Sequence, residues 1–237
     1  GKLTWSPDGR KIAVEFDFNI YAVDVETGEI SLLFSNGENP DWSPDGQYIA
    51  FERDLGIYFF DLASGQETFV RDGSYPVWSP DGKYLAISDI YGPDSGGEEI
   101  LQVEVETGRV VRLLLATQYS EWPVDWYKDG SKLLVGRFVP SPEDEKYGTL
   151  YADKYVLFTL DLSTCELVQI TDFEEWMTVM GASFGPNGEV VYDTLDGDLW
   201  IDNSLLLRAK DAGLECAHGP AWSPQGDKIA FIGWDGE

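Results

Sequence analysis

The sequence predicts an all-β protein built as a β-propeller of four-stranded antiparallel blades. Three observations support this class: a short motif recurs six times, short apolar runs follow each copy, and no stretch keeps a long helical period. The chain has 237 residues, of which 43% are hydrophobic and 14% aromatic. This apolar content is enough for a core and excludes disorder for the bulk of the chain. We therefore expect one domain of six repeats, with the sixth blade incomplete.

The repeat is built around Trp-Ser-Pro-Asp-Gly. It stands at residues 5–9, 42–46 and 78–82, and in altered form at 126–130, 184–188 and 222–226. An apolar run rich in Ile, Val, Tyr and Phe follows each copy. In the complete repeats a second run, a turn (Thr-Gly or Ser-Gly in the first three) and a third run come next. Runs of this composition bounded by turn residues are typical of β-strands.

One repeat corresponds to four strands, which we call A, B, C and D. Strand A ends at the Trp, and Pro-Asp-Gly forms the A–B turn because Pro fixes φ, Asp bonds back to the backbone and Gly accepts a positive φ. Thr-Gly or Ser-Gly forms the C–D turn. One such sheet cannot bury both faces alone, so successive sheets must pack around an axis. We expect each repeated Trp to pack between neighbouring blades.

The repeats divide the chain into blades at 1–36, 37–73, 74–118, 119–173 and 174–212, with a partial blade at 213–237. The partial blade has sequence for strands A and B only. An open blade leaves a strand edge unpaired. We therefore expect that the chain is part of a longer polypeptide or that a partner strand completes blade 6.

The repeat resembles the TolB-type propeller repeat, which also occurs in tricorn-type and prolyl-oligopeptidase-type propellers. The resemblance rests on the Trp-Ser-Pro-Asp-Gly copies, the Ile-Tyr-x-x-Asp pattern at 57–61 and the Ser-Gly pair at 64–65, and it covers essentially the whole chain. The fourth and fifth copies depart from it, with Tyr127-Lys128 and Phe184-Gly185 in place of Ser-Pro and Trp-Ser. The resemblance implies a propeller with an extracytoplasmic protein-interaction role, either periplasmic or secreted.

The connections between strands differ in length in a way that selects one face. The B–C connection grows by 7 residues in blade 3 and by 16 in blade 4, and the links into blades 4, 5 and 6 grow by 4 or 5. In a four-stranded meander, B–C connections and D–A links lie on the same side of the ring. Loops on a rigid scaffold commonly carry binding residues. We expect this loop face, over blades 3 to 5, to be the binding face.

The candidate binding residues on this face are aromatic or acidic. They are Tyr91, Glu98 and Glu99 in blade 3; Tyr119, Glu121 and Trp122 at the start of blade 4; Glu143, Asp144, Glu145, Tyr147 and Tyr151 in its long connection; Phe173, Glu174, Glu175 and Trp176 before blade 5; and His218 on the link into blade 6. Aromatic side chains can anchor an interface, and carboxylates select a cationic partner. The alternative is that these are solvated loops with a few packed aromatics.

Charge restricts the partners. The chain has 16 Lys and Arg against 43 Asp and Glu, a net charge of −27. A polyanion of this kind repels phosphate, which excludes nucleic acids and anionic lipids. No stretch approaches 18 consecutive apolar residues, so no membrane span is expected. The charge leaves a basic protein or peptide, divalent cations, a salty habitat or plain solubility as its explanation.

We expect no catalytic residues, no metal site and no cofactor, although calcium binding somewhere on so acidic a chain stays open. The sole His, His218, has no second His to join it. Residues 181–185 match Gly-x-Ser-x-Gly but fall in a predicted strand A, not before a helix. Residues 193–198 lack the spacing of a calcium loop and suit a B–C hairpin. Cys165 and Cys216 fall on opposite faces of different blades, so no disulfide is expected.

The expected function is a non-catalytic scaffold that binds a protein or peptide. One alternative is a propeller associated with an enzyme, either the gating domain of a peptidase or a polysaccharide lyase or hydrolase. A peptidase would need a catalytic domain, and a propeller lyase would need clustered His or basic residues. The other alternative is a structural subunit of an extracellular assembly.

Overall fold

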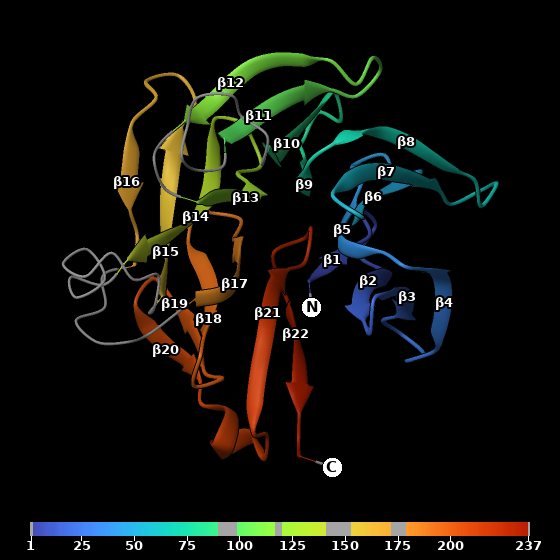
Figure 1. Cartoon of the computed structure of the whole chain (residues 1–237). Helices are drawn as coiled ribbons and strands as arrows, with labels where there is room; N and C mark the ends of the chain where they lie inside the picture. Colours follow the sequence, from blue (N-terminus) through green and yellow to red (C-terminus); the bar gives the residue numbers. More distant parts are fainter. Residues whose placement is uncertain (1, 90–98, 117–119, 141–152, 172–178, 237) are drawn as a thin grey trace.

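The computed structural model describes residues 2–89, 99–116, 120–140, 153–171 and 179–236. Within these residues, five antiparallel sheets of four strands and one sheet of two strands surround a central axis (Figure 1). The predicted all-β propeller is confirmed, and its sixth sheet holds strands A and B alone. No helix in the described part of the chain is long and apolar enough to cross a membrane.

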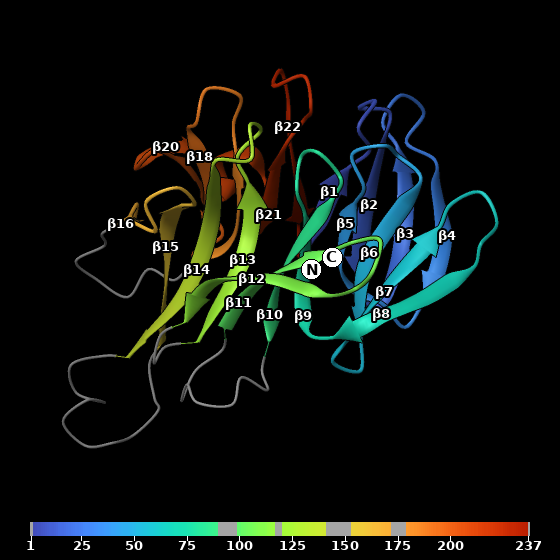
Figure 2. The same ribbon diagram turned by 90° about the horizontal axis from the view of Figure 1, so that it is seen from above.

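Each blade is a meander of consecutive strands, seen from above in Figure 2. Blade 1 contains β1 (Leu3–Trp5), β2 (Lys11–Phe16), β3 (Asn19–Asp24) and β4 (Ile30–Ser35). Blade 2 contains β5 (Glu38–Trp42), β6 (Tyr48–Arg53), β7 (Gly56–Asp61) and β8 (Glu67–Asp72). Blade 3 contains β9 (Ser74–Trp78), β10 (Tyr84–Asp89), β11 (Glu99–Glu104) and β12 (Val110–Ala116).

The remaining blades follow the same order with different strand lengths. Blade 4 contains β13 (Glu121–Trp126), β14 (Lys132–Pro140), β15 (Asp153–Asp161) and β16 (Leu167–Gln169). Blade 5 contains β17 (Val179–Phe184), β18 (Val190–Thr194), β19 (Leu199–Ile201) and β20 (Ser204–Leu207). A 3-10 turn, η1 (Ala209–Ala212), precedes β21 (Cys216–Trp222) and β22 (Ile229–Trp234) of the sixth sheet.

The A–B turn explains the recurring Ser and Asp of the motif. In blade 2, Ser43 Oγ donates to Asp45 Oδ1 at 2.6 Å and accepts from the Tyr48 N–H at 2.9 Å. Asp45 Oδ1 also accepts from the Gln47 N–H at 2.9 Å, and Gly46 takes the positive φ of 75° that closes the turn. Blades 1 and 3 repeat these bonds. The motif therefore satisfies the turn's own backbone groups.

The C–D turns use a second aspartate. Asp161 accepts hydrogen bonds from Ser163 and from the N–H groups of Ser163 and Thr164, and these bonds lower the pKa of Asp161 to about 2. Asp24 and Asp61 bond their turns in the same way. Some of the acidic residues therefore hold the C–D turns in place by hydrogen bonds to the turn backbone.

Neighbouring blades pack through apolar faces. Ala13, Ile20 and Phe34 of blade 1 pack against Ile49 and Phe51 of blade 2, and all five are buried. Similar clusters join blades 2 and 3, blades 3 and 4, and blades 4 and 5. These contacts supply most of the hydrophobic burial, because a single sheet has no other cover.

Hydrogen bonds near the axis join the blades at the residue that precedes the terminal aromatic of strand A. We call this residue the channel position; the six are Thr4, Asp41, Val77, Asp125, Ser183 and Ala221. Where the side chain is polar, it accepts the backbone N–H of the aromatic residue of the next blade. The N–H groups of Trp42, Trp78, Phe184 and Trp222 donate in this way to Thr4 at 3.3 Å, Asp41 at 2.7 Å, Asp125 at 2.8 Å and Ser183 at 3.2 Å.

Where the channel position is apolar, the indole replaces this bond. Trp126 Nε1 donates to the Val77 carbonyl at 3.1 Å, and Trp5 Nε1 donates to the Ala221 carbonyl at 3.0 Å. The second of these bonds closes the ring between blades 6 and 1. The indole N–H groups of Trp42, Trp78 and Trp222 make no hydrogen bond within the described residues. The repeated Trp therefore packs between blades, as expected, and bonds in one of two ways.

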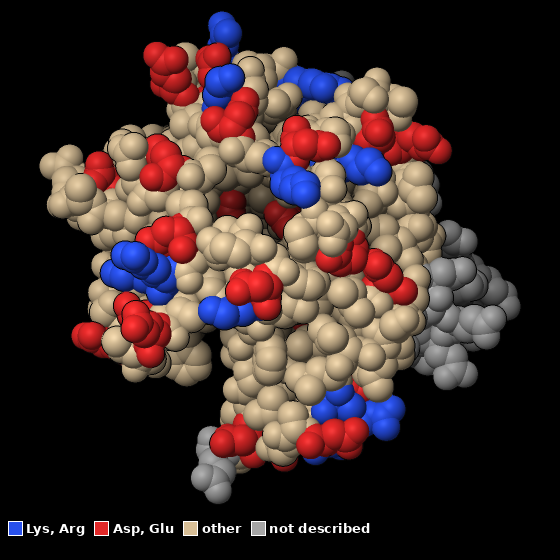
Figure 3. Space-filling view, turned by 180° about the vertical axis from the view of Figure 1, so that it is seen from behind, with Lys and Arg blue, Asp and Glu red and all other residues tan. Residues whose placement is uncertain are grey.

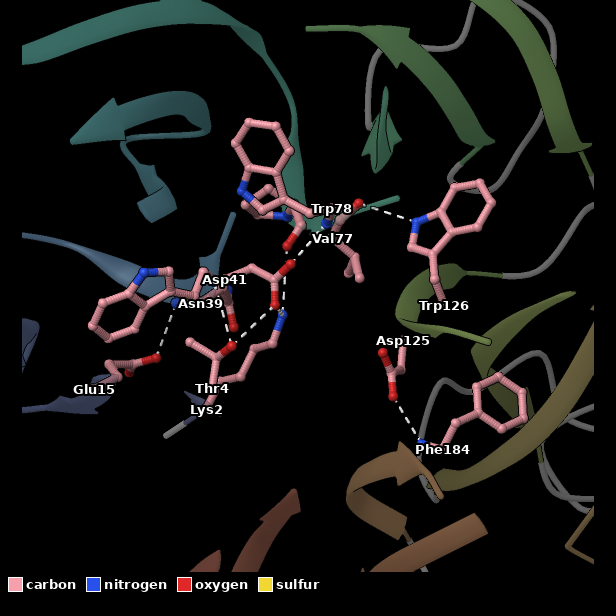
Figure 4. A network of polar contacts seen from close by, with 12 residues as sticks. Lys2, Thr4, Glu15, Asn39, Asp41, Val77, Trp78, Asp125, Trp126 and Phe184 are labelled. Carbon is pink, nitrogen blue, oxygen red and sulfur yellow. Dashed lines mark hydrogen bonds and ion pairs between the residues drawn. The ribbon is translucent and has the colours of Figure 1, made fainter. Parts of the chain in front are cut away.

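The pKa values of the two aspartates at channel positions, Asp41 and Asp125, are both raised. Desolvation raises the pKa of Asp125 to about 7, with a smaller contribution from the negative charge of Asp41. Desolvation also raises the pKa of Asp41, against the lowering effect of the Lys2 ammonium 3.6 Å away. Figure 4 shows the two carboxyl groups reaching the same central space from blades 2 and 4.

Two expectations about element positions are corrected. Cys216 and His218 lie within β21, not on the link before it, because Cys216 already pairs with Trp234 and the Ala217 N–H donates to the Gly197 carbonyl at 2.8 Å. In blade 4 the inserted residues do not all form a loop, since β14 and β15 are nine residues each and stay paired to Pro140↔Asp153. Both cysteines are free thiols.

Replacing Trp126 with Phe is expected to cost more stability than replacing Trp78 with Phe. Both side chains are nearly buried, at 6% and 7% exposed, so the change in packing is matched. Only Trp126 loses an indole hydrogen bond, to Val77, and the expected difference in free energy of unfolding is about 1 kcal/mol. Urea unfolding of both variants measures it. Equal losses would show that the indole bond does not hold blades 3 and 4 together.

Replacing Asp125 with Asn is expected to flatten the pH dependence of stability. The folded pKa of about 7 exceeds the ordinary 3.8, so the stability tied to protonated Asp125 is complete below about pH 4 and is lost as pH rises through 7. The loss is at most about 4 kcal/mol, and the Asn oxygen can still accept from Phe184. Thermal unfolding from pH 2 to pH 8 checks this, because it spans the titration windows of both Asp125 and the control Asp129.

Asp129→Asn serves as the control, because a hydrogen bond from Ser131 lowers the pKa of Asp129. Its stabilising contribution is present above the ordinary pKa and lost as pH falls, the opposite sign. If both variants change the profile in the same direction, the assignment to Asp125 is wrong.

Candidate functional site

The inner strands enclose a cavity of about 650 Å³ along the ring axis. Strand A of every blade contributes to its lining, so the hollow is a product of the repeat itself. Figure 3, which views the ring from behind, shows acidic side chains deep inside the opening. The acidic residues that line the cavity are Glu15, Glu38, Asp41, Asp125 and Asp193.

Toward the loop-face end of the cavity, strand A of blades 2, 3 and 6 contains a residue of positive φ within its β-bulge. Asn39, Tyr75 and Gly219 have φ of 50°, 53° and 60°, and each is followed by Pro. A carboxylate from strand B of the preceding blade accepts each N–H: Glu15 takes Asn39 at 3.1 Å, Glu52 takes Tyr75 at 3.2 Å and Asp193 takes Gly219 at 2.8 Å. Such bonds offset the conformational cost of a non-glycine residue in this region.

Four aromatic side chains lie together at this end of blades 3 and 4. We call Tyr75, Trp122, Phe138 and Tyr155 the aromatic shelf. Ring centroids are 6.0 Å apart for Tyr75 and Trp122, 5.2 Å for Trp122 and Tyr155, and 5.7 Å for Phe138 and Tyr155. Trp122 and Tyr75 also line the cavity, and Tyr75 is 37% exposed.

The sequence supports the shelf at one cross-strand position. Gly136 pairs with Trp122, and a Cβ added to Gly136 would overlap the Trp122 ring. The indole therefore lies flat on the backbone of β14, a position that a larger residue would deny it. A bulge between Pro123 and Asp125 gives this strand A one extra residue and sets where the ring points.

The electrostatics beside the shelf are negative. Glu38 lies at the cavity mouth, and its pKa is raised by desolvation and then by the charges of Glu15, Glu52 and Asp54. Lys2 is the cation within the cavity lining that pairs with a carboxylate, Asp41, and its Nζ also donates to the Pro76 carbonyl at 3.4 Å. The mouth therefore presents apolar rings next to mutually repelling carboxylates, a surface that favours a cation with an apolar stem.

The polar side chains of the cavity bond mainly to the backbone of neighbouring strands. His218 Nδ1 lies 3.2 Å from Asp193 Oδ2, but that carboxylate already accepts the N–H groups of Gly181 and Gly219. Ser183 lies in β17, and its Oγ accepts the Trp222 N–H. Among the described residues, no three His, Cys, Asp or Glu side chains converge as a metal site requires. Residues 193–198 form the predicted β18–β19 hairpin, with a turn bond from the Gly197 N–H to the Thr194 carbonyl at 2.8 Å.

Most of the predicted binding residues fall outside the described part of the chain. These are Tyr91, Glu98, Tyr119, Glu143, Asp144, Glu145, Tyr147, Tyr151, Phe173, Glu174, Glu175 and Trp176. Of the other four, Trp122 and His218 line the cavity. Glu99 starts β11 and is half-buried.

Glu121 corrects one expectation: it was predicted as a binding residue, but it lies inside blade 4. It is fully buried and forms an ion pair with Arg137, whose guanidinium lies 4.4 Å from the centroid of the Phe158 ring. The carboxylate therefore neutralises a buried cation inside blade 4 and is not displayed to a partner.

Sequence reasoning missed Tyr75, Phe138 and Tyr155 of the shelf and the carboxylates Glu15 and Glu52. One signal was available: the pairs Asn39-Pro40, Tyr75-Pro76 and Gly219-Pro220 stand at the same distance before the repeated Trp. This pattern marks the bulge of strand A at the loop-face end of the cavity. Phe138 and Tyr155 carry no such signal, because they are ordinary strand residues brought to the shelf by pairing.

Comparison with known proteins gives a fold likeness. No family model matches the chain, and no curated protein does. TolB from Acinetobacter baumannii is similar with a TM-score of 0.66 and 26% identity, over 85% of this chain and 51% of that one. The chain thus spans about half the length of that protein.

Two further structures are similar at lower identity. A structure assigned to TolB from Agrobacterium tumefaciens has a TM-score of 0.70 and 16% identity, over 98% of this chain and 89% of that one. A chain from a mitotic checkpoint complex has a TM-score of 0.64 and 14% identity, over 98% and 83%. The chain described here has a TolB-like β-propeller fold.

Proposed function

We propose that this chain is a non-catalytic propeller that binds a basic protein or peptide on the loop face of blades 3 to 5. The aromatic shelf at the acidic cavity mouth is the observation that carries the proposal. Aromatic and Arg anchors surrounded by polar groups dominate the energetics of protein interfaces. Four aromatic side chains lie at one end of the propeller beside several carboxylates. Together they form the described part of such a surface.

The shelf is suited to an extended segment with basic side chains. Lys and Arg can lay their methylene stems on Tyr75 and Trp122 while the charged group points toward Glu38 and Glu52. The net charge of −27 also attracts a cationic partner from a distance. Nucleic acids and anionic membranes have the wrong sign for this surface.

The predicted loop residues extend the same surface in the proposal. Residues 90–98, 117–119, 141–152 and 172–178 connect to strand ends at this face. They contribute Tyr91, Tyr119, Tyr147 and Trp176 as further anchors and Glu143, Asp144, Glu174 and Glu175 as further acidic groups.

A binding role agrees with the bonds of the cavity. Asp193 and Ser183 are both occupied by backbone N–H groups, which leaves neither as an obvious base or nucleophile. One similar chain comes from a multiprotein mitotic checkpoint complex, so this type of ring serves in an assembly there. The likeness to TolB is the basis for proposing that the chain works outside the cytoplasm.

A random 12-residue peptide library displayed on phage tests the proposal. Enriched peptides are expected to contain Lys or Arg next to aromatic residues, and a labelled synthetic copy is expected to bind with an affinity that falls from 50 to 500 mM salt. Trp122→Ala and Tyr75→Ala should each weaken this binding by about tenfold or more, measured by fluorescence polarisation.

Phe69→Ala is the matched control. Phe69 is 52% exposed on β8 of blade 2, away from the shelf, so its removal should leave peptide affinity within twofold. Circular dichroism confirms that each variant is folded. Enrichment of acidic peptides, or equal binding by the shelf variants, would refute the proposed surface.

A further inference from the structure

The outer edge of β22 carries the new inference. Among the described strands, β22 has one neighbour, β21 (Figure 1). The carbonyls of Lys228 and Trp234 accept from Ser223 and Glu215, so even-numbered residues of β22 point their backbone toward β21. In an antiparallel strand this direction alternates. Ile229, Phe231 and Gly233 therefore direct their N–H and C=O groups away from β21.

A second observation concerns blade 1, on the side that follows blade 6 in the ring. Strand pairing places Val14 opposite Tyr21 and Tyr21 opposite Leu32, and it places Ile12 opposite Val23 and Val23 opposite Ile30. Together with Phe16, these seven residues form one apolar sheet face. Phe16 is 71% exposed, Ile30 66% and Leu32 54%.

Blade 2 shows what normally covers such a face. Ile49 and Phe51 occupy the positions of Ile12 and Val14 in their blade, and both are 0% exposed. Their cover comes from strands C and D of the blade before, through Ile20 and Phe34; the Phe34 and Phe51 rings lie 4.4 Å apart. Among the described strands, β21 and β22 are the ones before blade 1, so its equivalent face is partly open.

The sixth sheet itself gives the same result. Ala230 occupies the position of Ala13, Ala50 and Ala86, all of which are 0% exposed, but it is partly exposed. Trp234, an even-numbered residue on the same face as Ala230, is 53% exposed. The open edge and the two incompletely covered faces thus define one wedge between blades 6 and 1.

We propose that this wedge is a docking site for a β-hairpin that supplies strands C and D of the sixth blade. Its first strand pairs antiparallel to β22 through the backbone groups of Ile229, Phe231 and Gly233. One face of the hairpin carries apolar side chains that cover Ile12, Val14 and Leu32, as Ile20 and Phe34 cover blade 2. The site continues the interface that β21 already makes with blade 1, where Trp5 bonds to Ala221.

A second copy of this chain does not fit the wedge. Its own β22 would have to enter together with β21, and β21 is held between blades 5 and 1 of that copy by the bonds of Ser183 and Trp5. The wedge between β22 and blade 1 has room for two further strands, because the neighbouring sheets have four strands each and this sheet has two. A free hairpin matches this width.

The test appends a hairpin with the sequence of residues 56–72, strands C and D of blade 2, after residue 237 through a ten-residue Gly-Ser linker. Linking raises the effective concentration to about the millimolar range, so failure to dock is informative. Amide hydrogen exchange at Phe231 and Gly233 is expected to slow at least tenfold relative to the unmodified chain. Exchange at Ala230 and Ile232, already directed toward β21, should change less.

Matched variants locate the contact. Leu32→Lys places a charge on the uncovered face and should abolish the added protection, while Ser31→Lys, on the opposite side of β4 and also exposed, should not. Phe231→Pro removes the central outward N–H and should do the same as Leu32→Lys, whereas Phe231→Ala keeps that N–H and should retain docking.

Three results would overturn the proposal. The first is unchanged exchange at Phe231 and Gly233 in the fusion. The second is protection that Leu32→Lys leaves intact, since the hairpin would then lie elsewhere. The third is a dimeric mass of the unmodified chain by light scattering that Phe231→Pro returns to a monomer, because a second copy would then occupy the edge. Loss of peptide binding at the aromatic shelf would affect none of these readouts.

Discussion

Each junction between blades depends on a hydrogen bond at the channel position. When that residue is Thr4, Asp41 or Ser183, its side chain accepts the backbone N–H of the next blade's Trp, and the indole N–H of that Trp makes no hydrogen bond among the described residues. Asp125 accepts in the same way from Phe184, which has no indole. When the residue at the channel position is Val77 or Ala221, the next indole donates to its carbonyl instead. Each of the five junctions that lead to a Trp shows one of these two arrangements. The repeat can therefore vary this residue without opening the ring, because a Trp at the following position can satisfy either arrangement.

Part of the acidic composition serves the fold itself, because many acidic side chains accept backbone N–H groups. Aspartates such as Asp61 and Asp161 satisfy turn N–H groups. Glu15, Glu52 and Asp193 accept the N–H groups of the residues of positive φ in the strand A bulges. Acidic groups of the second kind gather at the cavity mouth because every blade sends its strand B end there. A negative potential is thus built into the frame and is fixed before a ligand arrives. A cationic segment would meet it without reorganisation of the protein, which is the condition under which charge contributes most to recognition.

The sequence predicted the features that recur in every blade. Copies of Trp-Ser-Pro-Asp-Gly led to the blades, their turns and the Trp between blades, because each of those depends on residues within ten positions of one another. It could not place Tyr75 beside Trp122, or Glu121 beside Arg137, because those neighbours depend on strand register and on contacts between blades. Glu121 was expected at the surface for this reason, since an acid next to an exposed-looking Trp gives no sign of a buried guanidinium one strand away. The Pro that follows Asn39, Tyr75 and Gly219 was the one local mark of the cavity mouth. Most of the long-loop residues lie outside the described part of the chain, so their proposed role rests on sequence alone.

In this fold the inner ring of strands closes even though the sixth blade lacks its outer strands among the described residues. Strand β21 is bonded on one side through Ser183 and on the other through Trp5, so the inner wall is continuous around the axis although the sixth sheet has two strands. The missing cover falls only on the outer half, between β22 and blade 1. The aromatic shelf lies on blades 3 and 4, the opposite side of a six-fold ring. A partner on the shelf and a hairpin in the wedge therefore touch no common residue, and the two surfaces can be occupied at once while the same inner strands hold both in position.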